Sequence, residues 1–208
     1  MTGQSVLEEY IQALKNYKGF SGDIVCHKTI APVRAGHAGG GNPLPGHLND
    51  LIRQLGIDRL YSHQKEAVDR IRKGIHTVIA TPTASGKSLI YNLPVVDRMI
   101  REPDSHALYL FPLKALARDQ LESVRSLLKL ADRYVDPPEN RSPKKPRLNA
   151  AVYDGDISSY QKSKIRKAPP NILLSNPEML HLAMLAHHRL WEDFFGNLKY
   201  VVIDEVHT

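Results

Sequence analysis

The chain has 208 residues, of which 42% are hydrophobic and 24% charged, and this suits one ordinary globular domain with an extension. Lys and Arg total 28 against 22 acidic residues, a formal net charge of +6, which permits binding to a polyanion without proving it. The single cysteine, Cys26, excludes an internal disulfide and gives no sign of a Cys/His metal cluster or a secretory compartment.

Residues 1–45 predict an N-terminal extension and linker. Ser5 and Glu8 have the spacing of a capping box, and the residues around them predict an amphipathic helix. Charges interrupt its apolar residues, so we expect neither a signal peptide nor a membrane span, and a cytoplasmic protein is the default. A short strand is predicted over residues 24–30. The Gly- and Pro-rich residues 31–45 favour a linker over a phosphate-binding loop, since no Lys-Ser/Thr pair follows the glycines.

From residue 46 onward, helices and strands alternate, which predicts an α/β domain over residues 46–208. One predicted helix ends at Gly56, and a second runs from Ser62 to about Gly74. The predicted strands are continuous apolar runs, which are typical of parallel strands buried on both faces, so we expect a parallel sheet flanked by helices. The first helix has an apolar face of Leu48, Leu51, Ile52 and Leu55, and strands are predicted at residues 76–80, 107–111, 150–153, 172–175 and 200–204.

Residues 136–147 interrupt this alternation with prolines and clustered charge, which predicts a surface loop. Its basic residues, Lys144, Lys145 and Arg147, are candidates for contact with nucleic acid. A basic loop is more often simply solvated, so solvation is the favoured interpretation.

Residues 81–88, TPTASGKS, follow a predicted strand and precede a predicted helix, the context of a phosphate-binding loop. Backbone N–H groups of the turn would face phosphates, and Gly86 would allow their close approach. Lys87 would meet the β and γ phosphates, and the Ser88 hydroxyl would be a ligand for Mg²⁺. The alternative is a helix N-terminus with a solvated lysine. The predicted turn, whose N–H groups would face the phosphates, consists of Thr83, Ala84, Ser85 and Gly86.

Residues 201–207, VVIDEVH, predict an apolar strand that ends in two carboxylates. In a P-loop ATPase, Asp204 would hold Mg²⁺ through its water shell, and Glu205 would orient or deprotonate the attacking water. His207 would lie beside the γ-phosphate and couple hydrolysis to motion. An acidic turn after a strand is the alternative, but a phosphate loop and this sequence in one chain, in this order, argue against coincidence.

These residues resemble the DEAD/DEAH-box-like helicases of superfamily 2, over a stretch from about Leu48 to the end of the chain. Residues 204–207 resemble the DExH box and TPTASGKS resembles motif I, so the resemblance implies a RecA-like P-loop NTPase domain that binds ATP and Mg²⁺. Residues 61–64, YSHQ, resemble the Q motif. In that family the glutamine amide, here Gln64, reads the adenine edge, and Tyr61 would stack on the base.

Three further segments resemble the family's nucleic-acid motifs. Residues 111–120, FPLKALARDQ, resemble motif Ia, and the turns at residues 154–156 and 175–179 take the places of later strand-end loops. The resemblance implies contacts with the nucleic-acid backbone that do not read sequence. Ordinary strand-to-helix turns with N-caps are the alternative. The implied contact residues are Pro112, Lys114, Arg118, Gly155, Asn176 and Pro177.

Together the motif strings are most similar to those of the mitomycin-repair helicases and their RecQ-related relatives, which implies ATP-driven 3′ to 5′ movement on DNA more than on RNA. The chain ends just after the DExH box, so we expect the first half of a motor, without the second RecA-like domain and with little hydrolysis of its own. Alternatives are a double-stranded DNA translocase or remodeller and a nucleotide- or nucleic-acid-binding module without hydrolysis. A P-loop kinase would leave Gln64 and the DExH box unexplained.

Overall fold

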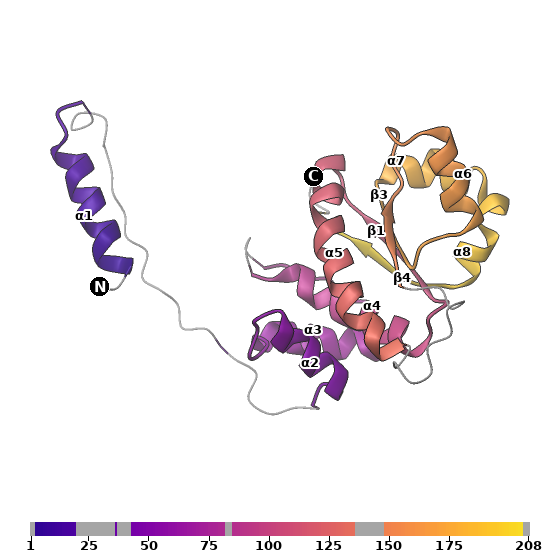
Figure 1. Ribbon diagram of the computed structural model, residues 1–208, viewed down its shortest axis with the longest axis horizontal. Helices are drawn as coiled ribbons and strands as arrows, with labels where there is room; N and C mark the ends of the chain where they lie inside the picture. Colours follow the sequence, from indigo (N-terminus) through magenta and orange to yellow (C-terminus); the bar gives the residue numbers. More distant parts are fainter. Residues whose placement is uncertain (1–2, 20–35, 37–42, 82–84, 136–147, 206–208) are drawn as a thin grey trace. The chain divides into compact units, whose positions relative to one another are not determined.

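A computed structural model of the chain describes residues 3–19, 36, 43–81, 85–135 and 148–205 (Figure 1). The chain divides into two units, Met1–Ala35 and Gly36–Thr208. The smaller unit contains the predicted N-terminal helix, α1 (Gly3–Asn16). Because α1 begins before Ser5, this residue lies inside the helix and not at the N-cap position that the sequence predicted. The strand predicted at residues 24–30, the glycine run and the loop at residues 136–147 lie outside the described residues.

Three helices open the larger unit: α2 (Gly46–Gln54), α3 (Ser62–Arg72) and α4 (Lys87–Arg101). Leu48, Leu51 and Ile52 of α2 are buried as predicted. Leu55 is an exception, since α2 has ended before it and its side chain is exposed. The turn after α3 takes a left-handed backbone conformation at Gly74, as expected where a glycine ends a helix.

A buried carboxylate holds these three helices together. Asp97 of α4 is fully buried, and its Oδ1 lies 2.8 Å from Nε2 of His47 on α2. Its Oδ2 accepts hydrogen bonds of 3.0 Å from Arg72 at the end of α3 and from Arg101 of α4. Burial alone would raise the pKa of Asp97, but the bonds from His47 and Arg72 and the charge of Arg101 outweigh it and hold the pKa below its usual value. Hydrogen bonds to one buried carboxylate thus join α2 and α3 to α4.

The predicted parallel sheet is confirmed. Within the described residues it has four strands, β1 (His106–Leu110), β2 (Ala150–Val152), β3 (Ile172–Ser175) and β4 (Leu198–Ile203), in the order β2-β3-β1-β4, with every pairing parallel. Helices connect the strands. α5 (Lys114–Val135) follows β1 and α6 (Ser159–Lys167) follows β2, while β3 leads into α7 (Pro177–Met179), the π-helix η2 (Leu180–Leu185), the 3-10 helix η3 (His188–Trp191) and α8 (Glu192–Gly196).

Helices cover both faces of the sheet (Figure 1). On one face, Ala107 and Tyr109 of β1 join a core made with α2 to α5. On the other face, Leu108 and Leu110 pack against a smaller cluster that includes Trp191. Burial on both faces, predicted for every strand, therefore holds for β1. Two hydrophobic cores therefore lie on opposite faces of β1 and β3.

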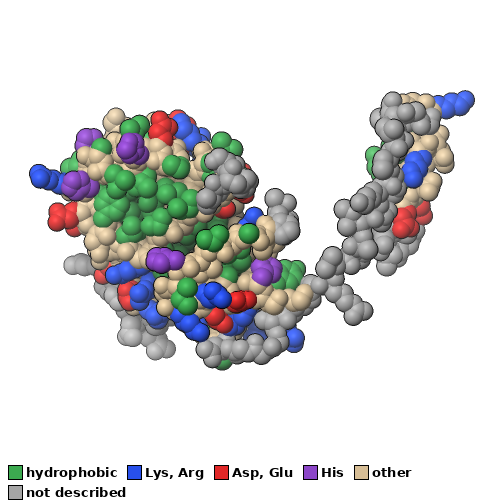
Figure 2. Space-filling model, turned by 180° about the vertical axis from the view of Figure 1, so that it is seen from behind, with side chains coloured by type: hydrophobic (Ala, Val, Ile, Leu, Met, Phe, Trp, Pro, Cys, Tyr) green, Lys and Arg blue, Asp and Glu red, His purple; other side chains and the backbone are tan. Residues whose placement is uncertain are grey.

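At β4 the prediction of burial on both faces is wrong. Val201 and Ile203 pair in register with Leu108 and Leu110 of β1, but their exposures are 53% and 57%. The cluster around Trp191 reaches β1, β3 and Leu198 at the start of β4, and no described side chain buries Val201 and Ile203 farther along the same face. Figure 2 shows hydrophobic side chains gathered on one face of the larger unit.

The strand predicted at residues 76–80 is also not formed, since the segment has no strand structure. Val78 is 97% exposed. A strand needs a neighbour to satisfy its backbone groups, so β propensity alone does not create one. Among the described strands, β4 lies at one edge of the sheet and pairs only with β1.

None of the helices in the described ranges is both long and apolar enough to cross a membrane.

Candidate nucleotide and nucleic-acid sites

Parallel strands bring the separate motifs to one edge of the sheet, because all four carboxyl ends point the same way. The first residue beyond β1, β2 and β4 bonds to a neighbouring strand: Phe111 N donates to Ser175 O at 2.9 Å, Tyr153 N to Leu174 O at 2.8 Å, and Asp204 N to Leu110 O at 3.0 Å. The loops after these three strands therefore begin at fixed places on this edge.

A surface hollow at this edge brings the phosphate loop and the acidic strand end together. Lys87 and Ser88 line one side, and Asp204 and Glu205 line another, as the sequence predicted for residues that serve one nucleotide. These residues line one hollow although the strand predicted before Lys87, at residues 76–80, is not formed. Three other residues line the hollow without having been predicted to contact nucleotide: Phe111, Leu116 and Gln120.

The phosphate loop has a backbone that favours glycine at position 86, directly before α4. Gly86 has a φ of 74° and a ψ of 32° as the N-cap of α4. A Cβ there would overlap Nε2 of Gln64, so both the conformation and the space favour glycine. Lys87 Nζ donates to Thr81 O at 3.1 Å, and the hydroxyls of Thr81 and Ser85 are 2.7 Å apart. Thr83 and Ala84 lie outside the described residues.

Gln64 contacts the phosphate loop directly. Its side chain is buried, its Oε1 accepts from Tyr61 N at 3.0 Å, and its Nε2 donates to the carbonyls of Ser85 and Gly86, both at 3.3 Å. To read an adenine edge, the amide would have to exchange at least one of these bonds. Tyr61 is partly exposed and stacks on His63 with ring centroids 5.8 Å apart.

The two acidic residues at the end of β4 have distinct environments. Asp204 Oδ2 accepts from Tyr91 OH at 3.3 Å, and its Oδ1 accepts from Glu205 N at 3.0 Å. Glu205 has a φ of 52°, a left-handed conformation that costs energy for a residue with a side chain and recurs at functional sites. His207 lies outside the described residues.

Tyr91 is a site residue that motif reading missed. Burial, joined by the charge of Asp204, raises the pKa of Tyr91 far above its ordinary value, so its hydroxyl keeps the proton that it donates. The neighbouring Ser88 hydroxyl acts on the pKa of Tyr91 in the opposite direction and lowers it, but burial outweighs this effect. The signal was present in the sequence, because Tyr91 follows Ser88 by three residues and therefore shares its face of α4.

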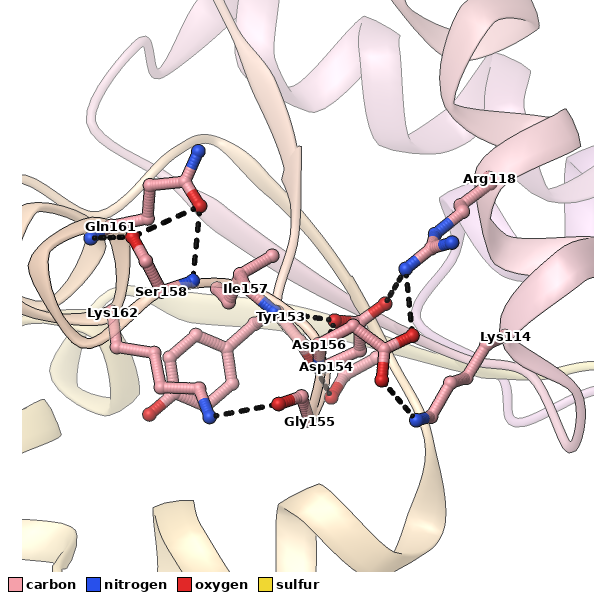
Figure 3. A network of polar contacts seen from close by, with 11 residues as sticks. Lys114, Arg118, Tyr153, Asp154, Gly155, Asp156, Ile157, Ser158, Gln161 and Lys162 are labelled. Atoms are coloured by element: carbon pink, nitrogen blue, oxygen red, sulfur yellow. Dashed lines mark hydrogen bonds and ion pairs between the residues drawn. The ribbon is translucent and has the colours of Figure 1, made fainter.

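The predicted nucleic-acid contacts after β1 and β2 meet in a network of ion pairs (Figure 3). Lys114 Nζ lies 2.7 Å from Asp156 Oδ1, and Arg118 Nη2 lies 2.9 Å from Asp156 Oδ2. Arg118 Nη2 also pairs with Asp154 Oδ2 at 3.0 Å. The hydrogen bond from Lys114 lowers the pKa of Asp156, and the hydrogen bond to Asp156 raises that of Lys114. Two aspartates thus neutralise both cations.

The two aspartates differ in burial. The Asp154 side chain is 3% exposed, and its Oδ1 accepts from the backbone N–H groups of Asp156 and Ile157 at 2.9 and 3.2 Å. Asp154 therefore shapes the loop, whereas the Asp156 side chain is 51% exposed. Between them, the Gly155 carbonyl accepts from Lys162 Nζ at 3.4 Å.

The remaining predicted contacts follow β3 and β1. Asn176 is buried and caps α7, because its side chain accepts from Met179 N at 2.8 Å. Pro177 occupies the first turn of α7. Pro112 lies between β1 and α5 and is partly buried. These residues occupy the strand-to-helix turns that the sequence predicted. Asn176 also acts as an N-cap, which is the role that an ordinary strand-to-helix turn would give it.

Comparisons with known proteins agree with the fold and the motifs. The chain is 42% identical over 170 residues to an ATP-dependent helicase, YprA, of Bacillus subtilis, covering 80% of the chain and 21% of that relative. It is 32% identical over 205 residues to the ATP-dependent helicase hrq1 of Schizosaccharomyces pombe, covering 97% of the chain and 18% of the relative. The chain thus spans about a fifth of the length of these curated relatives.

A solved structure of the DUF1998 helicase MrfA, bound to DNA and AMPPNP, superposes with a TM-score of 0.74 at 39% identity, over 86% of this chain and 23% of that one. The family model for the DEAD/DEAH box helicase matches residues 61–208. That range begins at Tyr61 and includes the phosphate loop, the whole sheet and the acidic strand end. The chain therefore belongs to the DEAD/DEAH box helicase family.

Proposed function

We propose that this domain binds ATP in the hollow beside the phosphate loop and belongs to a motor that couples ATP hydrolysis to movement on nucleic acid and to strand separation. The observation that carries the proposal is the meeting of Lys87 and Ser88 with Asp204 and Glu205 at one hollow. A P-loop ATPase needs these groups around one triphosphate. The match to the helicase family supports it.

In this proposal Lys87 exchanges its bond with the Thr81 carbonyl for the β and γ phosphates. The amides of the turn and of the first residues of α4 face the phosphates at the positive end of a 15-residue helix. Glu205 orients or deprotonates the attacking water, since it lines the same hollow. His207 would couple hydrolysis to motion.

The donors at the hollow fit Mg²⁺. The Ser88 hydroxyl and the Asp204 carboxylate both line the hollow, so two hard oxygen donors are available there, and Mg²⁺ prefers such ligands. Ser88 would hold the ion directly and Asp204 through water. Mg²⁺ held by these residues would supply positive charge that offsets the negative charge of the phosphate groups.

We further propose that Gln64 reads the adenine and that Tyr61 stacks on it. Gln64 already bonds to the carbonyls of Ser85 and Gly86, so adenine binding would be felt directly in the phosphate loop. Base recognition and phosphate binding would then be coupled through one side chain.

The nucleic-acid substrate in this proposal is DNA, contacted along the sheet edge at Pro112, Lys114, Arg118, Gly155, Asn176 and Pro177. The solved structure of MrfA, a similar protein, is bound to DNA, which supports DNA over RNA. The family resemblance of the motif strings supports 3′ to 5′ movement. These contacts would join basic side chains and helix N-termini of the protein to phosphates of the DNA. Binding should therefore be indifferent to base sequence and weakened by salt.

The first experiment measures ATP and GTP binding by calorimetry. Lys87→Ala should abolish binding of both nucleotides with Mg²⁺, because it removes the charge that meets the phosphates. Gln64→Ala should reduce the preference for ATP over GTP more than it reduces affinity for inorganic triphosphate. An unchanged preference in Gln64→Ala would remove adenine reading from the proposal, and ATP binding by Lys87→Ala would remove the phosphate site.

A second experiment separates a helicase from a translocase or a non-hydrolysing module. It uses a longer protein that contains this domain, as the curated relatives do, and compares ATP hydrolysis with single-stranded and duplex DNA. A helicase should also separate a partial duplex with a 3′ overhang, and Glu205→Gln should abolish both activities. Hydrolysis stimulated only by duplex, without strand separation, would indicate a translocase.

A further inference from the structure

The loop at residues 154–158 presents a carboxylate to the two cations that the proposed function assigns to nucleic acid. Lys114 and Arg118 are four residues apart on α5 and therefore project from one face of its first turns. Asp156 bridges them with one oxygen each, Oδ1 to Lys114 at 2.7 Å and Oδ2 to Arg118 at 2.9 Å (Figure 3).

A phosphodiester has the same bonding pattern, since it also presents two anionic oxygens to a pair of donors. The first turn of α5 adds the positive end of a 22-residue helix. In the structure, Asp156 thus occupies the place that a backbone phosphate would take between Lys114 and Arg118. The formal charge of the cluster, with Asp154 included, is zero.

We propose that Asp156 is a resident anion that nucleic acid must displace, so that this side chain weakens binding by competing with a phosphate for Lys114 and Arg118. The inference rests on the proposed function of these two cations. It adds to that function a residue that sets affinity and salt dependence.

Displacement is feasible because ion pairs with Lys114 and Arg118 are what hold the Asp156 carboxylate in place. The Asp156 side chain is 51% exposed, and exposed ion pairs are individually weak. Its backbone N–H donates to the buried carboxylate of Asp154, and this bond does not depend on the Asp156 side chain. The carboxylate can therefore rotate into solvent while the loop keeps its shape.

The surroundings attract an anion once Asp156 has moved. Asp154 stays beside Arg118, and the cluster then carries a net positive charge. The following helix, α6, has the sequence SYQKSKIRK, with basic residues and no acidic ones. Lys162 of α6 already reaches the Gly155 carbonyl, between the two aspartates. An approaching phosphate would therefore find Asp154 as the remaining acidic side chain of the cluster, next to the basic helix α6.

The test is binding of a labelled single-stranded DNA to the 208-residue chain, by fluorescence anisotropy, with NaCl varied from about 25 to 200 mM. Asp156→Asn keeps the shape of the side chain and removes its charge. We expect it to tighten binding by about three- to tenfold at the lowest salt, the size typical of one or two exposed ion pairs. The dependence on salt should steepen by about 0.7, as for one added contact to a single strand.

Asp119→Asn is the matched control. Asp119 is an exposed residue of α5, next to Arg118 in sequence, and makes no ion pair with any described residue. Its substitution changes the net charge of the protein by the same amount. Affinity gained equally in Asp119→Asn and Asp156→Asn would reduce the effect to overall charge and overturn the proposal, as would weaker binding by Asp156→Asn.

Two further variants separate this inference from the proposed function. Lys114→Ala and Arg118→Ala should weaken binding, and adding either to Asp156→Asn should remove the gain. If both alanine variants weaken binding but Asp156→Asn gives no gain, the cations contact nucleic acid and only the competition is refuted. If neither alanine variant weakens binding, both ideas fail. Asp156→Ser should reproduce the gain, and circular dichroism melting checks that each variant is folded.

Discussion

The hydroxyl of Tyr91 donates a hydrogen bond of 3.3 Å to Oδ2 of Asp204, and so joins the helix after the phosphate loop to the acidic end of β4. The ring itself is held separately. It packs edge-to-face on Tyr109 at 5.3 Å, and Tyr109 OH in turn donates to Asn92 Oδ1 at 2.9 Å. Loss of the Tyr91 hydroxyl should therefore leave the fold intact.

We predict that Tyr91→Phe weakens binding of ATP with Mg²⁺ by about three- to tenfold, the usual worth of one hydrogen bond. The reason is that Asp204 loses a donor that orients its carboxylate beside Ser88. Calorimetric titration with Mg²⁺ and with EDTA checks this. The effect should be confined to the Mg²⁺ titration, and an equal loss in EDTA would show that Tyr91 supports the phosphate loop in general and not Asp204.

Gly86→Ala should destabilise the domain and abolish nucleotide binding. The left-handed φ of 74° costs a residue with a Cβ about 1–2 kcal/mol, and the overlap with Gln64 Nε2 adds to this. Urea unfolding of the single variants and of Gly86→Ala/Gln64→Ala separates the two costs. The double variant should be more stable than the sum of the single effects predicts, since removing the Gln64 amide relieves the overlap but not the backbone strain. Strict additivity would show that Gly86 is needed for its backbone conformation alone.

Asp97→Asn should lower the free energy of unfolding by about 1–3 kcal/mol, because it weakens charged hydrogen bonds to a buried group. Glu102→Gln is the control, as it removes a partly exposed partner of Arg98 in the same helix and should cost at most about 0.5 kcal/mol. Urea unfolding near neutral pH compares the two. Similar small costs would mean that packing, and not Asp97, holds α2 and α3 on α4.

The same carboxylate predicts a pH dependence. Its pKa is lower in the folded than in the unfolded chain, so its contribution is complete above the unfolded value, about pH 4, and is lost as the pH falls through the folded value. The unfolding midpoint of the wild type should thus fall more steeply below about pH 4 than that of Asp97→Asn. Parallel profiles would contradict this.

The elements that the sequence predicted well are those whose signals are local. The helix predicted from Ser62 to about Gly74 is α3, which ends at Arg72 just before that glycine, and the helix predicted after the phosphate loop is α4. β1 and β3 are short apolar runs that the sheet buries on both faces. The phosphate loop and Asp204-Glu205 are contiguous strings, and their shared hollow follows from the parallel topology.

The features that escaped prediction depend on residues distant in sequence. The strand expected at residues 76–80 lacks a neighbour in the described sheet. The bond between Tyr91 and Asp204 joins positions 113 residues apart, and Asp156 neutralises Lys114 across 42 residues. A motif string shows the cations of one loop and the acids of another, but it does not show that they meet.

The uncovered face of β4 leads to a last prediction. Val201 and Leu108 are register partners on adjacent strands, yet Val201 is 53% and Leu108 only 1% exposed. Leu108→Ala should cost about 2–5 kcal/mol, as for a cavity in a packed core. Val201→Ala should cost less than about 1 kcal/mol, because its side chain already contacts water and only edge-strand propensity is lost.

Urea unfolding at several protein concentrations measures both variants. If Val201→Ala proves as costly as Leu108→Ala, something covers the outer face of β4 in solution. A cost that grows with concentration would identify the cover as a second copy of the chain, since an exposed apolar strand at a sheet edge is prone to self-association. A cost that is small and independent of concentration is the result expected for a face that is open to water, and in that case the stability of this domain resides in the two cores around β1 and β3.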